Sequence, residues 1–325
     1  MAVSCRGGGR SCPGLSLVEL LVSLAIGAVL SFAVTHFLLG SKLSFLQSDE
    51  LARLQENGAY ALRLLAHELA MAGHLGREIP GSGIATTVEG SGCFGFLLDT
   101  TAPLFHVNDV SANGVAASGG AAPPADCLLP RQHQPGTDIL VVRRASGTTL
   151  IAAGEVRGAP DADALYLQAG SQGSTAVLRR GADARDSGDL WEYIPAVFFL
   201  RQYSRSPGDD IPTLCRKRPG RTSGRMAPTE CLVEGIENLQ LEFGIDDNGD
   251  LQADRFERAP TTAELARAVA ARLSLLVRSV HPVPGHRDTS SYLLAGSRVP
   301  AAGDGYYRRI LQATVLLRNN PVFRW

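Results

Sequence analysis

The chain has 325 residues, 45% of them hydrophobic, which is enough for one large or two ordinary domains with a buried core and excludes intrinsic disorder for most of its length. The formal net charge is -1 and no run of Lys and Arg residues is interleaved with aromatic residues, so we expect no nucleic-acid partner. Aromatic residues make up only 6% while Gly and Pro are plentiful, which favours a loop-rich β domain over a compact helical one.

An apolar segment near the N-terminus, residues 15–39, carries Glu19 as its only formal charge. At about 1.5 Å per residue, a helix of this length reaches the roughly 30 Å of bilayer hydrocarbon. Arg6 and Arg10 precede the segment and Lys42 follows it. This mild bias predicts a cytoplasmic N-terminus, with the rest of the chain outside.

A secretory signal peptide is the alternative for such a segment. The apolar run is longer than the roughly 7–15 residues of a signal peptide core, and the small residue Gly14 precedes the run instead of following it. An ionisable side chain inside the membrane is costly unless it is paired, so Glu19 indicates a functional site. These features favour a retained membrane helix.

The segment from Gly14 to Leu24, GLSLVELLVSL, closely resembles the class III signal of type IV prepilins and type II secretion pseudopilins. In that family a prepilin peptidase cuts after the glycine, the new N-terminus is methylated, and the glutamate at the fifth mature position contacts the N-terminus of a neighbouring subunit. The resemblance implies cleavage between Gly14 and Leu15, methylation of Leu15, and an assembly role for Glu19. The chain departs from the family at Pro13, where a basic residue is usual.

The physical chemistry of a buried charge agrees with this role for Glu19. A carboxylate within one helical turn of a protonated amine on the next subunit gains a charge-assisted hydrogen bond that offsets its desolvation. A mismatched register would leave both charges unpaired.

Beyond the membrane segment the helix is predicted to continue as an amphipathic one, ending near Gly73. Its apolar residues recur at spacings near three and four: Leu43, Leu46, Leu51, Leu54, Ala61, Leu62, Leu65 and Leu69. Such an apolar stripe predicts that a following domain packs on the outer half of the helix. His67 and His74 are interpreted as surface or packing residues of this region.

Strand candidates dominate the rest of the chain. They are rich in Val, Ile, Leu, Phe and Tyr and lie at 138–143, 149–152, 164–167, 192–203, 239–243, 273–280 and 310–317. Before them, the Gly-, Ala- and Pro-rich stretch within 81–126 is interpreted as loop. We expect these strands to form an antiparallel sheet that packs against the helix.

Several of these later segments are similar to PilW-type minor pilins. The segments in question are 137–143, 211–216, 234–240 and the closing 314–319. The similarity therefore reaches the middle and the end of the chain as well as its start.

Four cysteines remain after the expected cleavage: Cys93, Cys127, Cys215 and Cys231. An even number of thiols in an oxidising exterior suggests disulfides, with three possible connectivities. We favour Cys93 with Cys127 and Cys215 with Cys231, because each pair is nearest in sequence and closes one irregular loop. A zinc site lacks the C-x-x-C spacing, and buried free thiols are the remaining alternative.

An acidic segment in the last third of the chain raises the alternative of calcium. Its oxygen-bearing side chains are Asp246, Asn248, Asp250 and Asp254, at spacings that a calcium loop can use. The segment departs from the EF-hand pattern, which requires Gly where Leu251 stands and a Glu at the twelfth place. A solvated turn built on Asn248 and Gly249 is the preferred interpretation, so no cofactor is expected, with calcium as the alternative.

The sequence thus predicts an α+β, pilin-like fold in which a long N-terminal helix, transmembrane and then amphipathic, packs on an antiparallel β-sheet domain. The expected parts are a cleaved leader at 1–14, the transmembrane half of the helix at 15–40, its amphipathic half at 41–75, and an exterior β-rich globular domain at 76–325 with a flexible tract near 108–126.

The expected function is that of a minor pilin that primes type IV pilus polymerisation near the pilus tip, and no catalytic motif is found. Its implied partners are other minor pilins, the major pilin, the prepilin peptidase, the bacterial inner membrane and a tip adhesin. The exterior domain would face the periplasm before it reaches the cell surface. The alternatives are a minor pseudopilin of a type II secretion system and a single-pass anchored enzyme, receptor or adhesin.

Overall fold

The computed structural model describes residues 16–76, 84–111, 123–128, 132–152, 155–169, 176–184, 188–221 and 224–323. The chain divides into two units, residues 1–49 and 50–325, and the helix α1 (Leu17–Met71) belongs in part to each. The expected leader, together with Leu15, lies outside the described residues, as does most of the predicted flexible tract.

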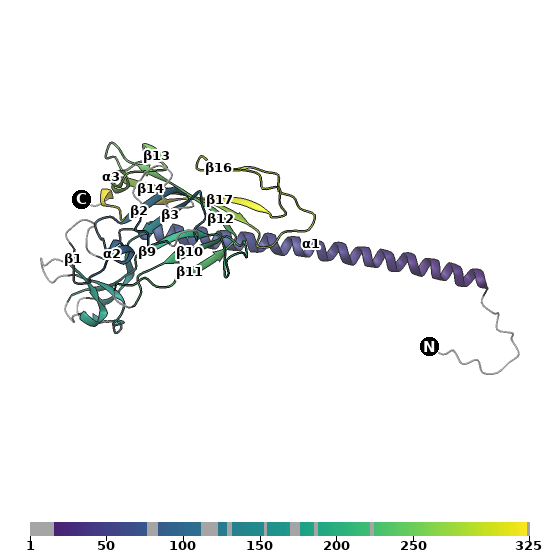
Figure 1. Cartoon of the computed structure of the whole chain (residues 1–325), viewed down its shortest axis with the longest axis horizontal. Helices are drawn as coiled ribbons and strands as arrows, with labels where there is room; N and C mark the ends of the chain where they lie inside the picture. The colour runs from purple at the N-terminus through teal and green to yellow at the C-terminus, as the bar shows by residue number, and fades with distance from the viewer. Residues whose placement is uncertain are drawn as a thin grey trace. The chain divides into compact units, whose positions relative to one another are not determined.

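The described part of the first unit is the N-terminal part of α1, a long helix in Figure 1. Most of its side chains are apolar and exposed. The hydroxyls of Ser23 and Thr35 donate to the carbonyl oxygens of Glu19 and Ser31, four residues earlier, at 2.7 and 2.8 Å. Such bonds satisfy the polar groups within the helix itself, which an apolar surrounding requires. α1 is the one described helix that is long and apolar enough to cross a membrane.

The outer part of α1, in the second unit, is amphipathic as predicted. Leu54, Ala61, Leu65 and Leu69 are buried in the main core. Close packing depends on Gly58, because a Cβ atom there would come within 2.5 Å of Leu311 Cδ1. The stripe of small and apolar residues therefore lets the helix approach the sheet beneath it.

The helix α1 ends where the sequence predicts. Its last residue is Met71, and Gly73 follows with φ at +80°, a conformation that favours glycine. The amide of Gly73 donates to the Arg143 carbonyl oxygen at 3.0 Å. A Cβ atom at this position would also meet the Asn319 carbonyl oxygen at 2.5 Å, so the end of the helix is fixed to the surrounding domain.

A four-stranded antiparallel sheet lies against the outer part of α1. Its strands in spatial order are β13 (Arg255–Glu257), β12 (Ile236–Ile245), β14 (Ala268–Arg278) and β17 (Arg308–Leu316). The register pairs Leu241 with Leu273 and Leu275 with Leu311. Figure 1 shows β12, β14 and β17 as long neighbouring strands, and their inward side chains join those of α1 in the main core.

A five-stranded sheet continues the core. Its strands in spatial order are β11 (Glu230–Glu234), β10 (Thr213–Lys217), β9 (Ala196–Arg201), β3 (Thr137–Val142) and β2 (Leu104–Val110). All of its pairings are antiparallel. The two central strands β9 and β3 are almost wholly buried, so both faces of this sheet are covered.

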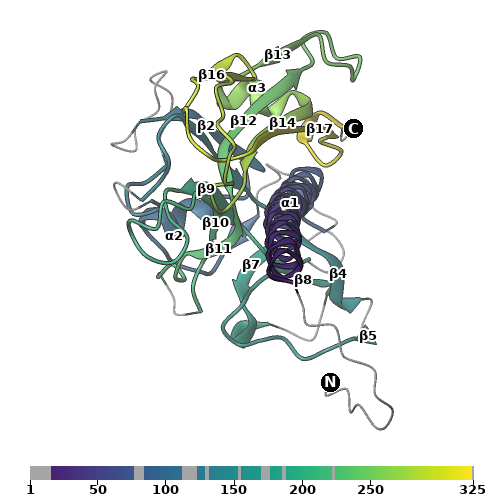
Figure 2. The ribbon, with the colours of Figure 1, turned by 90° about the vertical axis from the view of Figure 1, so that its right-hand side faces the viewer.

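The third sheet has six strands. In spatial order they are β1 (Ala85–Thr86), β7 (Val177–Arg180), β6 (Leu165–Gln168), β8 (Leu190–Tyr193), β4 (Ala145–Ala152) and β5 (Glu155–Val156). Only the short β1 pairs in parallel, with β7. Figure 2 views α1 nearly end-on, with β14 and β17 on one side of it and β4 and β8 on the other.

Short elements complete the described fold. They are α2 (Gly92–Leu97), α3 (Thr262–Ala266), the 3-10 turns η1 (Gly181–Asp183) and η2 (Pro321–Phe323), and a hairpin of β15 (Tyr292–Leu294) and β16 (Ser297–Val299). At the start of α3 the hydroxyl of Thr261 accepts from the Glu264 amide, while the Glu264 carboxylate accepts from Thr261. This reciprocal capping explains why so short a helix forms there.

The predicted α+β class is confirmed, but two details of the prediction are wrong. Residues 192–203 are not one strand, because Pro195 separates β8 from β9, which belong to different sheets. The tract interpreted as loop is also placed too early in the chain, since β1, α2 and β2 lie within 81–126 and β2 extends to Val110. The predicted flexible tract near 108–126 thus begins inside β2, whose side chains pack into a core that local composition does not reveal.

Candidate functional site

The candidate assembly site is the first turn of α1, where Glu19 lies. Ser16 is the first residue that the structure describes, so Gly14 and Leu15 lie outside the described residues. Ser16 opens the helix: its hydroxyl accepts from the Val18 amide at 3.3 Å and its carbonyl oxygen from the Leu20 amide at 3.1 Å.

The Glu19 carboxylate is available to a partner. Its side chain is exposed and makes no hydrogen bond or ion pair with the described residues. The neighbouring side chains are apolar and more than half exposed: Leu17, Val18, Leu20, Leu21 and Val22. The helix therefore offers a single carboxylate within an apolar surface, an arrangement that favours pairing with a cation on another apolar helix.

The structure contains the two disulfides favoured from the sequence. Cys93 and Cys127 are joined with their Cα atoms 4.8 Å apart, and both are fully buried. The amide of Cys93, at the start of α2, donates to both carboxylate oxygens of Asp126 at 2.9 Å. This bridge ties α2 to the segment before β3, next to a small core that includes Val107 and Ile139.

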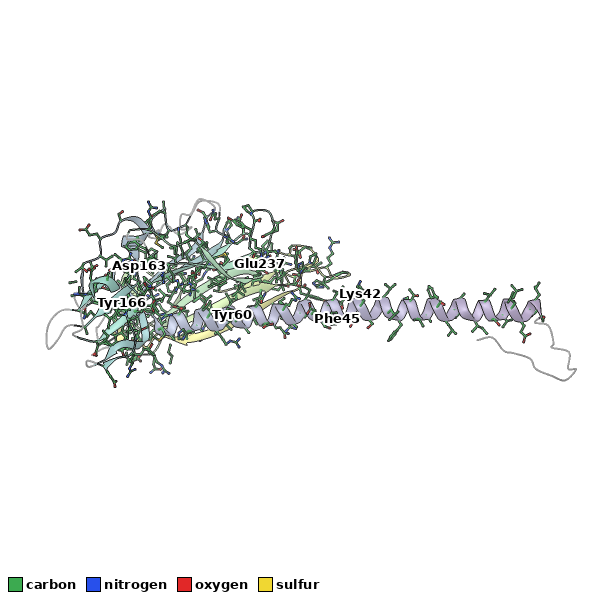
Figure 3. All side chains as sticks on the ribbon, turned by 90° about the horizontal axis from the view of Figure 1, so that it is seen from below. Lys42, Phe45, Tyr60, Asp163, Tyr166 and Glu237 are labelled. Carbon is green, nitrogen blue, oxygen red and sulfur yellow. A yellow bond between two sulfur atoms is a disulfide. The ribbon has the colours of Figure 1, made fainter. Side chains whose placement is uncertain are left out.

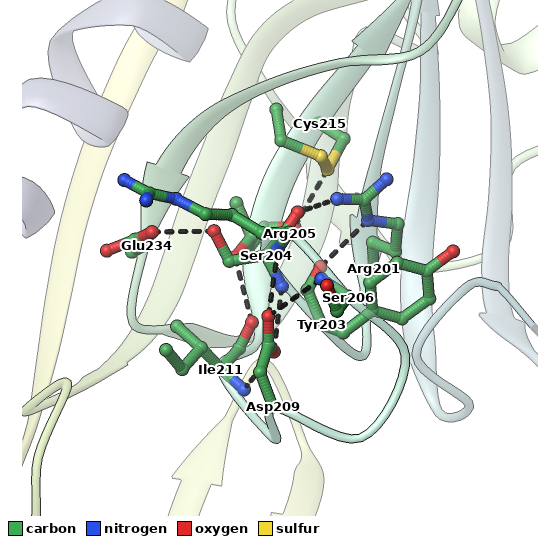
Figure 4. The surroundings of a disulfide bond; sticks show 11 residues. Arg201, Tyr203, Ser204, Arg205, Ser206, Asp209, Ile211, Cys215 and Glu234 are labelled. Atoms are coloured by element: carbon green, nitrogen blue, oxygen red, sulfur yellow. Dashed lines mark hydrogen bonds between the residues drawn. A yellow bond between two sulfur atoms is a disulfide. The ribbon is translucent and has the colours of Figure 1, made fainter.

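The second disulfide joins Cys215 on β10 to Cys231 on β11, which are partners in the strand register. Figure 4 shows this bridge next to the turn between β9 and β10. The two strands are connected by residues 218–229, so the bridge closes an irregular loop, as the sequence spacing suggests.

The turn beside this disulfide is organised by Asp209 (Figure 4). Its carboxylate accepts hydrogen bonds from four backbone amides, those of Ser204, Arg205, Ser206 and Ile211. Desolvation would raise the pKa of Asp209, but these four hydrogen bonds outweigh it and lower the pKa well below the ordinary value. The carboxylate is therefore ionised at neutral pH, and the turn is held in one conformation.

Removal of the second disulfide by Cys215→Ser with Cys231→Ser should lower the free energy of unfolding by about 3 kcal/mol, because a loop of this size is no longer restricted in the unfolded chain. Chemical unfolding of the detergent-solubilised chain, followed by the fluorescence of its Trp residues, measures the change. Peptide mapping without reductant should join Cys215 to Cys231 in the natural protein. Alkylation of both thiols in unreduced protein would contradict the assignment.

The acidic segment Asp246 to Asp254 forms the loop between the antiparallel strands β12 and β13. The buried carboxylate of Asp246 accepts from the amides of Asn248, Gly249 and Leu251 at 2.6–3.1 Å. Burial alone would raise the pKa of Asp246, but these amide hydrogen bonds lower it. The preferred interpretation as a turn agrees with this geometry.

The other candidate calcium ligands also bond within the loop. The Asp254 carboxylate accepts from the Asp247 amide at 2.8 Å and from the Asn248 side chain at 3.1 Å, while Asp250 accepts from the Gln252 amide. Within the described residues, no three His, Cys, Asp or Glu side chains are gathered as a metal site. Calcium binding at this loop stays a prediction from the sequence.

A buried ion pair that the sequence did not predict holds α1 inside the exterior domain. Glu68, on the buried face of α1, accepts from Arg144 Nε and Nη2 at 2.7 and 2.8 Å. The two residues are only 4% and 8% exposed, so this pair ties the outer helix to the start of β4 inside the protein. A signal was present: Glu68 follows Leu65 by three residues and therefore falls on the apolar stripe.

Comparisons with known proteins agree with the N-terminal helix and the sheet region. Residues 9–35 match the prokaryotic N-terminal methylation motif, and residues 197–319 match the Type IV pilus-assembly protein W family. The comparison with curated proteins gives no match. A type IV-like pilin from Thermus thermophilus is similar in structure, with 11% identity, 82% of this chain and 96% of that chain covered, and a TM-score of 0.38, a likeness too distant to support a conclusion.

The methylation motif and the exposed apolar helix make this chain a type IV pilin-like protein, membrane-anchored through α1. The family that residues 197–319 match is one of pilus-assembly proteins, which implies interaction with other pilus components. The match that begins in β9 and ends after β17 identifies this part of the chain as a PilW-type domain.

Proposed function

We propose that this chain is a minor pilin, a structural and assembly subunit that primes type IV pilus polymerisation and lies near the pilus tip. The observation that carries the proposal is Glu19: an exposed carboxylate without a partner among the described residues, in the first turn of an apolar helix, within a matched methylation motif. A structural role needs no catalytic centre, and we assign none.

The proposed maturation precedes assembly. A prepilin peptidase cuts between Gly14 and Leu15, and the new amine of Leu15 is methylated. Residues 15–40 then hold the chain in the inner membrane, residues 41–75 form the outer helix, and residues 76–325 face the periplasm. The positive residues before the apolar segment support this orientation.

The proposed partners are the other minor pilins and the major pilin, which meet the chain through the apolar helix. Glu19 pairs with the N-terminal amine of a neighbouring subunit, and this charge pairing fixes the register between helices. A tip adhesin is a further proposed partner of the exterior domain.

A minor pseudopilin of a type II secretion system is the second candidate, because the methylation motif serves both machines. The match to a pilus-assembly family over residues 197–319 favours the pilus. An anchored receptor or adhesin is the third candidate, and for that protein Glu19 would be dispensable. Deletion of the gene separates the first two candidates: loss of pili supports the first, and loss of protein secretion with normal pili supports the second.

The maturation step gives a direct test of the proposal. Mass spectrometry of the N-terminal peptide from membrane-extracted protein should find methylated Leu15 as the first residue. A strain that lacks the prepilin peptidase is the control and should retain the leader. A mature chain that begins at Met1, or after residue 39, would contradict the prepilin assignment.

A further inference from the structure

A cavity of about 690 Å³ lies between the six-stranded sheet and the connection from β10 to β11. Its volume falls within the roughly 300–1,000 Å³ of small-molecule pockets. One wall comes from β6, β8 and the turn before β6, where Figure 3 labels Asp163 and Tyr166. The other wall comes from residues 218–221 and 225–228 of the connection.

The wall formed by this connection is fixed by the protein's own hydrogen bonds. The Gly220 amide donates to the Arg225 carbonyl oxygen at 2.7 Å, and the Ala227 amide donates to the Arg218 carbonyl oxygen at 2.9 Å. Arg180 Nη1, from β7, donates to the carbonyl oxygens of Gly220 and Arg221 at 3.3 and 3.1 Å. The cavity is therefore formed before any ligand arrives, which lowers the entropic cost of binding.

The charges that line the cavity are balanced. Four arginines and four carboxylates contribute to it: Arg180, Arg218, Arg221, Arg225, Asp161, Asp163, Glu192 and Glu230. A purely anionic or purely cationic ligand would meet like charges as often as opposite ones. A hydroxyl group suits both kinds of side chain, because it can donate to a carboxylate and accept from a guanidinium.

Some of these charged side chains, Glu192 and Arg225 among them, are free to meet a ligand. Glu192 on β8 and Arg225 on the connection are exposed, and neither side chain has a hydrogen bond or ion pair with the part of the chain that the structure describes. In contrast, Arg221 is paired with Asp161 at 2.5 Å, and Glu230 is paired with Arg218 at 3.1 Å. The free acceptor and the free donor therefore line the same cavity.

The backbone around the cavity does not favour a peptide. The strands β6, β7 and β8 are each paired with a neighbouring strand on both edges. A peptide could not extend the sheet there, since its strand would find no open edge. Recognition must come from side chains, among which Ile194, Pro195 and Met226 add an apolar surface for C–H groups.

We propose that this cavity is a binding site for a neutral saccharide. The hydroxyls of the sugar exchange hydrogen bonds with Glu192 and Arg225, and its C–H face packs on the apolar lining. The site is independent of the assembly helix, so changes in the cavity should leave pilus assembly intact.

The test uses the full chain, purified in detergent, on an array of immobilised neutral oligosaccharides that end in mannose, galactose or N-acetylglucosamine. At least one of these oligosaccharides should bind the chain and retain it on the array. Glu192→Ala and Arg225→Ala should each weaken its binding by roughly tenfold or more, because each removes a charge-assisted hydrogen bond. Glu192→Gln, which still accepts a hydrogen bond, should lose less than Glu192→Ala.

Arg309→Ala is the matched control, since Arg309 is exposed on β17 outside the cavity. This variant should bind the oligosaccharide as the natural protein does. The thermal unfolding midpoints of all variants report whether they are folded. The proposal would be overturned if no neutral oligosaccharide on the array bound the natural protein, or if the natural protein and both alanine variants bound equally well. It would also be overturned if the natural protein bound charged peptides on a parallel array and Glu192→Ala did not. Surface piliation of these variants separates this site from the assembly function.

Discussion

Replacement of Glu19 by Ala should leave the protein inserted in the membrane and cleaved, yet produce few or no surface pili. The change removes both the cost of a carboxylate in lipid and its pairing with the amine of a neighbouring subunit. Membrane insertion does not need the carboxylate, because the apolar side chains around it supply the burial in lipid. Because the proposed role of the chain is to prime polymerisation, the defect should appear even when the major subunit is present at its normal level.

The measurement is the yield of sheared surface pili in a strain that lacks the native gene copy, together with the membrane level of each variant. Glu19→Gln should be partly active, since an amide still accepts a hydrogen bond but carries no charge. Glu56→Ala is the matched control, because Glu56 is exposed on the same helix outside the apolar segment. Natural piliation with Glu19→Ala would show that this carboxylate does not act in assembly, and an anchored receptor would become the better proposal.

Replacement of Glu68 by Ala should lower the free energy of unfolding by about 3–5 kcal/mol. The substitution leaves Arg144 buried without its carboxylate, and the remaining hydrogen bond of Arg144, to the Ala145 carbonyl oxygen at 3.3 Å, is long. The loss should also loosen the outer part of α1 from the sheets, because the pair joins the helix to the start of β4.

Two further variants show whether the lost stability comes from the unpaired charge. Glu68→Leu combined with Arg144→Met removes both charges and should be less destabilised than Glu68→Ala, since apolar residues often replace a buried pair at little cost. Glu56→Ala, at an exposed position of the same helix, should change stability by less than about 0.5 kcal/mol. Urea unfolding of the detergent-solubilised chain gives all three values. Equal stability of Glu68→Ala and the natural protein would mean that the pair contributes nothing.

The long helix and its contact face could be predicted because their signals are local. Apolar side chains at spacings of three and four identify the buried residues Leu54, Ala61, Leu65 and Leu69, and Gly73 marks the end of the helix. The disulfide pairs also follow from short spacings along the chain. In each case the residues that determine the structure lie within a few helical turns or one loop of each other.

The ion pair and the cavity could not be predicted because their parts come from distant segments. Glu68 and Arg144 are 76 residues apart, and no local pattern joins them. The cavity needs Glu192 on β8 and Arg225 on the connection between β10 and β11, which meet only after two sheets have formed. The division of residues 192–203 into two strands could have been inferred from Pro195, because proline disrupts a central strand.

The central proposal, that this chain is built into pili as a minor subunit, is tested most directly by mass spectrometry of pili sheared from cells and purified away from membranes. The account predicts that peptides of the chain are present at a small fraction of the major subunit, and that its N-terminal peptide begins at methylated Leu15. The same chain with Glu19→Ala should be found in the membrane fraction. Purified pili that contain no peptide of the chain, while the processed protein is abundant in the membrane, would contradict the account.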